Sequence, residues 1–300
     1  MLFGLVLGLL LVEGGLRLGA FVTSRYYALA SPGSSDGRVR ILTLGDSNTF
    51  GLYVGRLQAY PHLLEAQWNA RTGNRPIEVL NGGYPGNSSW SVLARLGDLL
   101  AKYRPDIVTI MVGANDAWRE PEPRAAMPIE ACVERARAGV VAPDVPRVGG
   151  WRLMRALKLL ESWLPMPAED LPLINRWRPQ RPQFDPAWSS DLVANLHFIA
   201  ACAERSGAQV VFLTYPGSGV LYDVANDAMR VSALQASLPW IDLAQRFAPR
   251  CRKSRCDYLY PDQHPTRAGH AWIAEILVEG LPAAVPSLAP DEGGPAKPGA

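Results

Sequence analysis

The middle of the chain contains five short runs that are rich in valine, isoleucine and leucine. They are Val39–Leu44, Ile77–Leu80, Asp106–Val112, Gln209–Tyr215 and Pro239–Leu243. Each run is continuously apolar and does not alternate between apolar and polar residues. Continuous runs are typical of strands that are covered on both faces of a sheet. The pattern therefore predicts five buried strands.

Helical periodicity occupies the stretches between these runs. Apolar residues recur every three or four positions in Pro61–Arg71, Ser88–Tyr103, Asp191–Ser206, Val224–Ser237 and Ala268–Leu281. Strands that alternate with helices build right-handed βαβ units, and such units share a parallel sheet. We therefore expect an α/β fold with a five-stranded parallel sheet.

One segment, residues 117–187, interrupts this alternation. It separates the third predicted strand from the next helix and is rich in proline and tryptophan. A structureless loop of this length is uncommon inside a compact domain. We interpret it as an insertion that covers one end of the sheet, with a possible amphipathic helix at Trp151–Leu164. The alternative is a flexible surface excursion.

The first 22 residues are almost entirely apolar, and a membrane-spanning helix needs roughly 20 such residues. Glu13 and Arg17 interrupt the run but would share one helix face. A retained membrane anchor is our first interpretation. A cleaved signal peptide with a site near Ala28–Ala30 is the second, and a buried soluble helix is the third. The basic residues Arg17 and Arg25 follow the run, so the charge rule gives no support for an external domain.

These features divide the chain into three parts. We place the apolar segment and the start of a linker at residues 1–30, one folded domain at 31–281, and a disordered tail rich in Pro, Gly and Ala at 282–300. The formal net charge is +2 and no run of Lys or Arg occurs, so the sequence predicts no nucleic-acid partner.

The four cysteines contain no C-x-x-C pair, which argues against zinc or thioredoxin-like chemistry. Cys251 and Cys256 bracket a short basic loop and could form a disulfide, which an exported protein would permit. The alternative is that all four thiols are reduced.

Four polar blocks stand after predicted strands. They are Gly45–Thr49 (GDSNT), Asn81–Ser88 (NGGYPGNS), Gly113–Asp116 (GAND) and Tyr260–Thr266 (YPDQHPT). In a parallel sheet, ligands bind beyond the carboxyl ends of the strands. A serine can act there as a nucleophile, glycine N–H groups and an asparagine amide can hold an oxyanion, and a histidine can serve as a base. Each block alone is also consistent with an ordinary turn or helix cap.

As an ordered set, the four blocks resemble the SGNH hydrolases, also called the GDSL family of lipases and acylhydrolases. The stretches Leu44–Gly51 (LGDSNTFG) and His264–His270 (HPTRAGH) are very similar to that family. The resemblance spans roughly residues 38–281 apart from the long insertion. It implies a flavodoxin-like three-layer α/β/α sandwich, and the apolar amino terminus suggests a membrane-anchored bacterial type.

The resemblance implies that Ser47 is the nucleophile and His264 its general base. The family usually has an aspartate three residues before the histidine, but here Pro261 occupies that position. Asp262, two residues before the histidine, is our first choice for orienting the imidazole, and Asp257 is the alternative. A serine–histidine pair without a carboxylate is also open.

The resemblance also implies an oxyanion hole. Its donors would be the backbone N–H groups of Ser47 and Gly86 and the side-chain amide of Asn115. Gly82 and Gly83 lie in the same glycine-rich loop and compete with Gly86 for this role.

These roles imply ester cleavage through an acyl-serine, with no cofactor or metal. The expected substrate is a small-molecule, glycan or lipid ester, such as an O-acetylated glycan. An O-acyltransferase that passes the acyl group to a carbohydrate is an alternative, and a catalytically silent binding module is another. We expect the protein to be membrane-anchored, with its catalytic domain periplasmic or extracellular.

Overall fold

The computed structural model describes residues 8, 11–15, 37–72, 75–118, 128–139, 188–251 and 256–289. Its sheet contains β1 (Val39–Gly45), β2 (Ile77–Gly83), β3 (Ile107–Met111), β4 (Gln209–Leu213) and β5 (Trp240–Ile241). All neighbouring strands are parallel, in the order β2-β1-β3-β4-β5. The five-stranded parallel sheet predicted from the apolar runs is therefore confirmed, in the flavodoxin-like strand order.

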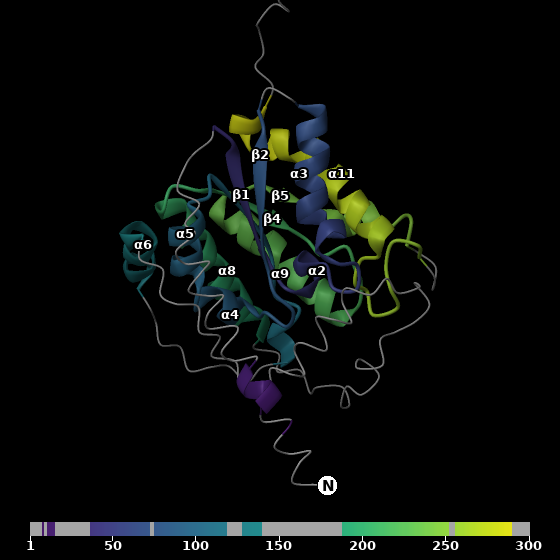
Figure 1. The fold of residues 1–300 in the computed structure, drawn as a ribbon, viewed down its shortest axis with the longest axis horizontal. Coiled ribbons are helices and arrows are strands. Elements are labelled where there is room, and N and C mark those ends of the chain that lie inside the picture. Colours follow the sequence, from purple (N-terminus) through teal and green to yellow (C-terminus); the bar gives the residue numbers. More distant parts are fainter. Residues whose placement is uncertain are drawn as a thin grey trace, which may run out of the picture.

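Helices flank both faces of the sheet and complete three layers (Figure 1). One side carries α3 (Tyr60–Arg71) packed on α11 (Arg267–Ala284), and the other carries α5 (Leu96–Tyr103), α8 (Trp188–Arg205) and α9 (Val220–Ala236). The shorter helices are α2 (Ser47–Phe50), α4 (Ser89–Leu93), α6 (Ile129–Ala138) and α10 (Leu243–Phe247). Three 3-10 turns lie at Arg56–Gln58, Asp116–Trp118 and Pro286–Leu288.

The carboxyl ends of β1, β2 and β3 lie side by side because Gly45 pairs with both Gly83 and Met111. Two glycines make this close approach possible. A Cβ on Gly45 would collide with the side chain of Thr49, and one on Gly83 would collide with the backbone of Phe50. The short helix α2 can therefore sit directly on the strand ends.

Two predicted elements differ from those in the structure. The single helix expected at Ser88–Tyr103 is broken into α4 and α5 at Arg95, whose guanidinium turns back to donate to the Ser91 carbonyl and the Asn87 amide oxygen. The last strand is only two residues long, since Asp242 caps helix α10 by accepting from Gln245 N–H at 3.0 Å.

Part of the predicted insertion belongs to the domain. Helix α6 lies inside residues 117–187, packs on α5 and α8, and is joined to α8 by a disulfide between Cys132 and Cys202. The helix expected at Trp151–Leu164 lies outside the described residues.

The described structure continues past residue 282, where we placed the start of the tail. Helix α11 continues to Ala284 despite Pro282, and Val285 and Leu288 are buried in the core. The chain therefore remains part of the domain at least to Ala289, the last described residue.

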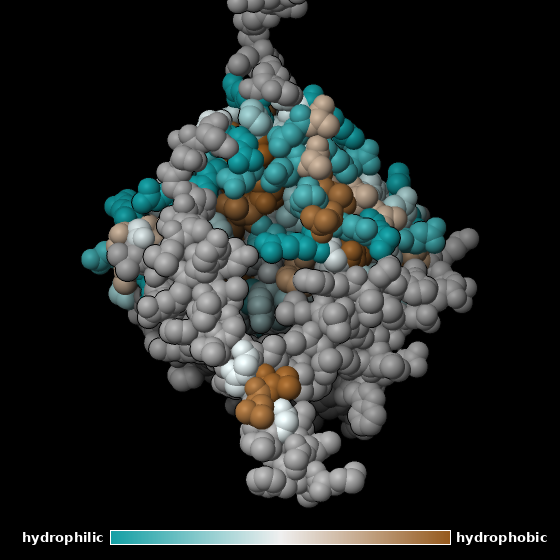
Figure 2. Space-filling view, in the orientation of Figure 1, coloured by the Kyte–Doolittle hydropathy of each residue, from teal (hydrophilic) through white to brown (hydrophobic). Residues whose placement is uncertain are grey.

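Most of the apolar amino-terminal segment lies outside the described residues. Residues 11–15 are helical, and Leu11 and Val12 expose their side chains. This short helix is the purple one at the lower end of Figure 1, where Figure 2 shows hydrophobic surface in brown. Within the described ranges, no helix has the length and apolarity that crossing a membrane requires.

Candidate active site

Ser47 is the first residue of α2, immediately beyond the end of β1. Its Oγ lies 2.7 Å from Nε2 of His264, and both side chains are largely buried. This is hydrogen-bonding distance for a hydroxyl and an imidazole, and it is the contact through which a base removes a serine proton. The structure thus joins residues that are 217 positions apart in the sequence.

Asp262 lies on the other side of the imidazole. Its Oδ2 is 3.0 Å from Nδ1 of His264, close enough for the carboxylate to orient the imidazole ring. Burial alone would raise the pKa of Asp262, but its contacts with His264 and with the Tyr53 hydroxyl outweigh burial and lower that pKa below the ordinary value. The carboxylate is therefore held ionised beside the ring.

A tight loop allows Asp262 to contact the His264 ring although only one residue separates them. The N–H of Tyr260 donates to the carbonyl of His264 at 2.8 Å, and Gln263 adopts a left-handed φ of 71°. The loop thereby turns the Asp262 carboxylate toward the imidazole. Asp257, the alternative partner, has an exposed side chain.

Asp46 fixes the start of α2, the helix that begins with Ser47. It is 1% exposed and caps α2 by accepting from Asn48 N–H at 2.9 Å. It also accepts from the Tyr215 hydroxyl at 2.7 Å and from the Asn115 amide at 3.1 Å. Burial raises the pKa of Asp46, and the hydrogen bonds from Tyr215 and Asn48 offset part of that rise. The hydrogen-bond partners of Asp46 are therefore residues that surround the site, and its role is structural.

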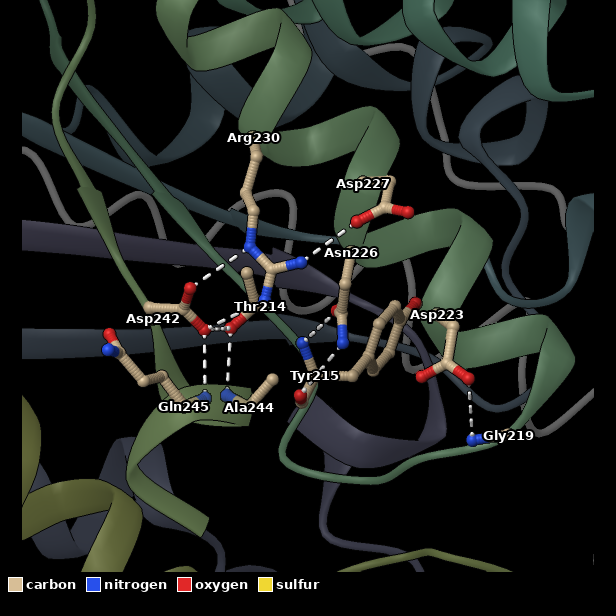
Figure 3. Close-up of polar contacts among 10 residues, drawn as sticks. All are labelled: Thr214, Tyr215, Gly219, Asp223, Asn226, Asp227, Arg230, Asp242, Ala244 and Gln245. Atoms are coloured by element: carbon tan, nitrogen blue, oxygen red, sulfur yellow. Dashed lines mark hydrogen bonds and ion pairs between the residues drawn. The ribbon is translucent and has the colours of Figure 1, made fainter. Parts of the chain in front are cut away.

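Tyr215, at the end of β4, is itself fixed by helix α9 (Figure 3). Its backbone N–H donates to Asn226 Oδ1 at 2.6 Å, and Asn226 Nδ2 donates back to the Tyr215 carbonyl at 3.3 Å. This reciprocal pair positions the phenol hydroxyl that contacts Asp46. Neither residue was predicted from the sequence to belong to the site.

The glycine-rich loop after β2 contains the second candidate backbone donor. Gly82 and Gly83, the competing candidates, lie within β2, whereas Gly86 lies in the loop with a φ of 79°. Among the described residues, the N–H groups of Ser47 and Gly86 donate to no acceptor. Both are therefore available to an oxygen atom of a ligand.

Asn115 lies at the same site but is already engaged. Its Nδ2 donates to Asp46 Oδ2 at 3.1 Å and to the Asn87 carbonyl at 2.9 Å. A primary amide has two N–H bonds, so both are used in this arrangement.

Asp116 supports the glycine-rich loop without entering the site. It accepts from the backbone N–H of Ser89 at 2.9 Å and from the Ser89 hydroxyl, and Asn195 on α8 donates to the same hydroxyl at 2.8 Å. The block Gly113–Asp116 therefore ties the start of α4 to the end of β3. Within the described ranges, no group of three His, Cys, Asp or Glu side chains is placed to hold a metal ion.

Comparisons of the chain with known proteins point to one family. Residues 43–215, more than half of the chain, match the sequence profile of the GDSL-like lipase/acylhydrolase family. The thioesterase 1/protease 1/lysophospholipase L1 of Escherichia coli K12 is 34% identical over 84 residues, which are 28% of this chain and 38% of that protein. An arylesterase of Vibrio mimicus is 34% identical over 86 residues, 29% of this chain and 42% of that protein. The chain thus spans about two fifths of the length of these relatives.

Solved structures share the fold at lower identity. A lipase/acylhydrolase from Enterococcus faecalis superposes with a TM-score of 0.51 at 17% identity, over 82% of this chain and 96% of that one. The acetyl xylan esterase AlAXEase gives a TM-score of 0.52 at 15% identity, over 81% of this chain and 100% of that one. These likenesses confirm the predicted fold class.

Proposed function

The chain belongs to the GDSL-like lipase/acylhydrolase family, and from this premise we propose that it is a serine esterase that works through an acyl-Ser47 intermediate. The observation that carries the proposal is the 2.7 Å contact between Ser47 Oγ and His264 Nε2, with the Asp262 carboxylate 3.0 Å from the other ring nitrogen. A nucleophile, a base and an orienting carboxylate in this order are the requirements of serine acyl transfer.

In the proposed reaction, Ser47 Oγ bonds to the carbonyl carbon of the ester while its proton moves to Nε2 of His264. The tetrahedral oxyanion accepts hydrogen bonds from the N–H groups of Ser47 and Gly86. Collapse breaks the carbon–oxygen bond to the alcohol, which leaves with the proton from His264. Water then repeats the sequence on the acyl-serine, giving the free acid and restoring Ser47.

Asn115 would be the third oxyanion donor in this proposal. Because both of its amide protons are engaged with Asp46 and the Asn87 carbonyl, it must release or share one of them when charge develops on the substrate oxygen. One donor of this kind is worth about a hundredfold to a thousandfold in kcat. The two backbone donors therefore form the part of the hole that exists before substrate arrives.

The names of the relatives define the substrate classes worth testing. They include a thioesterase and lysophospholipase, an arylesterase and an acetyl xylan esterase. An acetyl ester on a glycan and a lipid ester are the two classes that we propose to compare first.

Hydrolysis of p-nitrophenyl acetate, butyrate and octanoate, acetylated xylan and a lysophospholipid by the full-length chain tests the proposal. We expect Ser47→Ala and His264→Ala each to lower kcat by at least about a thousandfold. Ser287→Ala removes an exposed hydroxyl in the 3-10 turn after α11 and serves as the matched control. Full activity of Ser47→Ala would exclude the acyl-serine, whereas an acylated sugar in place of free acid would identify acyl transfer.

We also propose that the domain works in an oxidising compartment, periplasmic or extracellular, and is tethered by its apolar amino terminus. Support comes from the cysteines, which form the disulfides Cys132–Cys202 and Cys251–Cys256, and from the length of the apolar run. Cell fractionation with thiol alkylation before reduction tests this. We expect membrane-bound protein without free thiols, and soluble protein with four alkylated thiols would contradict it.

A further inference from the structure

The motif Asp262–His264 is one residue shorter than the family pattern requires, yet the carboxylate reaches the imidazole. We propose that Tyr53 is a positioning residue that holds the Asp262 carboxylate against His264 and so compensates for the shortened spacing. The inference rests on the proposed function of the site, because positioning matters only if His264 acts as a base.

The first observation is a shared oxygen. The Tyr53 hydroxyl donates to Oδ2 of Asp262 at 2.9 Å, and this same oxygen lies 3.0 Å from Nδ1 of His264. The other carboxylate oxygen, Oδ1, accepts from the backbone N–H of His264 at 3.3 Å. The hydroxyl on Oδ2 and the backbone N–H on Oδ1 together restrict the rotation of the carboxylate about its side chain. Without the hydroxyl, Oδ2 loses the donor that holds it beside Nδ1 of His264.

The second observation is packing. Tyr53 is 3% exposed, and its ring meets the rings of both His264 and Tyr260 edge-on with centroids 5.4 Å apart. Tyr53, Val54 and Tyr260 form a small buried cluster of their own, separate from the main core. The phenol is therefore packed against the loop that carries Asp262 and His264, and its hydroxyl has little freedom to point elsewhere.

The third observation is backbone conformation. Tyr53 has a φ of 74° and Gln263 a φ of 71°, and neither is glycine. A bulky residue in the left-handed region is strained and persists only where its surroundings hold it. Both strained residues adjoin the same carboxylate, although they are far apart in the sequence. We infer that the contacts of Asp262 with Tyr53 and His264 hold these two residues in the strained conformation.

Tyr53→Phe is the direct test, since it removes the hydroxyl and keeps the ring. We expect kcat for p-nitrophenyl acetate to fall about tenfold with KM unchanged, because a hydrogen bond to a charged group is lost and substrate contacts are not. Tyr103→Phe removes a hydroxyl from helix α5, outside the site, and should leave both constants unchanged. Thermal unfolding of each variant checks that the fold is intact.

A double-mutant cycle with Asp262→Asn separates positioning from general support. If Tyr53 acts through the carboxylate, Tyr53→Phe should cost less than about twofold in the Asp262→Asn background. An equal loss in both backgrounds, or a loss in KM alone, would overturn the inference. If Ser47→Ala retains activity, the proposed function itself fails; if Ser47→Ala is inactive and Tyr53→Phe matches wild type, this inference alone fails.

Discussion

At the scale of single residues, Asp46 shows how a charge can serve a reaction site without taking part in the reaction. Its carboxylate, one residue before Ser47, is buried and accepts hydrogen bonds from Asn48, Tyr215 and Asn115. A buried carboxylate is tolerated only when such donors replace water. The consequence is that one side chain holds the block after β1 to the block after β3 and to Tyr215, which follows β4.

His270 is the residue whose titration should be visible in the stability of the domain. Its ring is fully buried on α11 and accepts from Tyr60 N–H at 3.2 Å, and burial lowers its pKa to about 3. In the unfolded chain a histidine titrates near pH 6.5, so the unfolded state binds the proton first as the pH falls. The contribution of His270 is complete above about pH 6.5 and is lost progressively toward about pH 3, by up to about 1.4 kcal/mol per pH unit.

Denaturant unfolding between pH 4 and pH 7 measures this effect. His270→Asn can still accept from Tyr60 N–H but cannot take up a proton, so we expect its unfolding free energy to fall less steeply with acid than that of wild type. His62→Asn replaces an exposed histidine of helix α3 and should keep the wild-type slope. Equal slopes for wild type and His270→Asn would show that the buried ring does not titrate as described.

At the scale of elements, two disulfides close loops of very different length. Cys132 and Cys202 are 70 positions apart and join α6 to α8, whereas Cys251 and Cys256 are 5 positions apart. Chain entropy predicts about 4 kcal/mol of stabilisation for the longer loop and about 2 kcal/mol for the shorter one.

Paired serine substitutions test this ranking by urea unfolding. We expect Cys132→Ser with Cys202→Ser to lower the unfolding free energy by about 2 kcal/mol more than Cys251→Ser with Cys256→Ser. Wild type with and without reductant provides the reference. A larger loss from the short loop would mean that local structure, rather than loop closure, sets the contribution of each bridge.

The elements also show which parts of the fold were readable in the sequence. The strands were predictable because burial on both faces leaves a continuous apolar run. Helix α6 was missed because it lies in a segment with no strand beside it. The break at Arg95 and the early end of β5 depend on hydrogen bonds between side chains and the backbone. A hydropathy pattern does not contain such contacts, so neither feature could be predicted from it.

The site was readable to a similar extent. The closeness of the blocks that carry Ser47 and Asn115 was predictable, since they follow the neighbouring strands β1 and β3. The contact of His264 with Ser47 was predictable only from the family resemblance, because helix α10 separates its block from β5. The contribution of Tyr53 was not, because it depends on a left-handed backbone conformation and a contact across 209 positions.

At the scale of the whole molecule, the strand order explains how one site forms from distant segments. With β1 central between β2 and β3, the blocks that follow these three strands meet at one edge of the sheet. The block before α11 completes the site, because the contact of His264 with Ser47 joins the two ends of the domain.

Covalent labelling of the full-length chain with a fluorophosphonate, read by mass spectrometry of the Ser47 peptide, tests the central claim most directly. We predict that wild type is labelled on Ser47 alone and that His264→Ala, which keeps the hydroxyl but loses the base, is labelled at least about a hundredfold more slowly. Folded wild-type protein that stays unlabelled, or that carries the label on a different serine, would contradict the claim that Ser47 is the activated nucleophile.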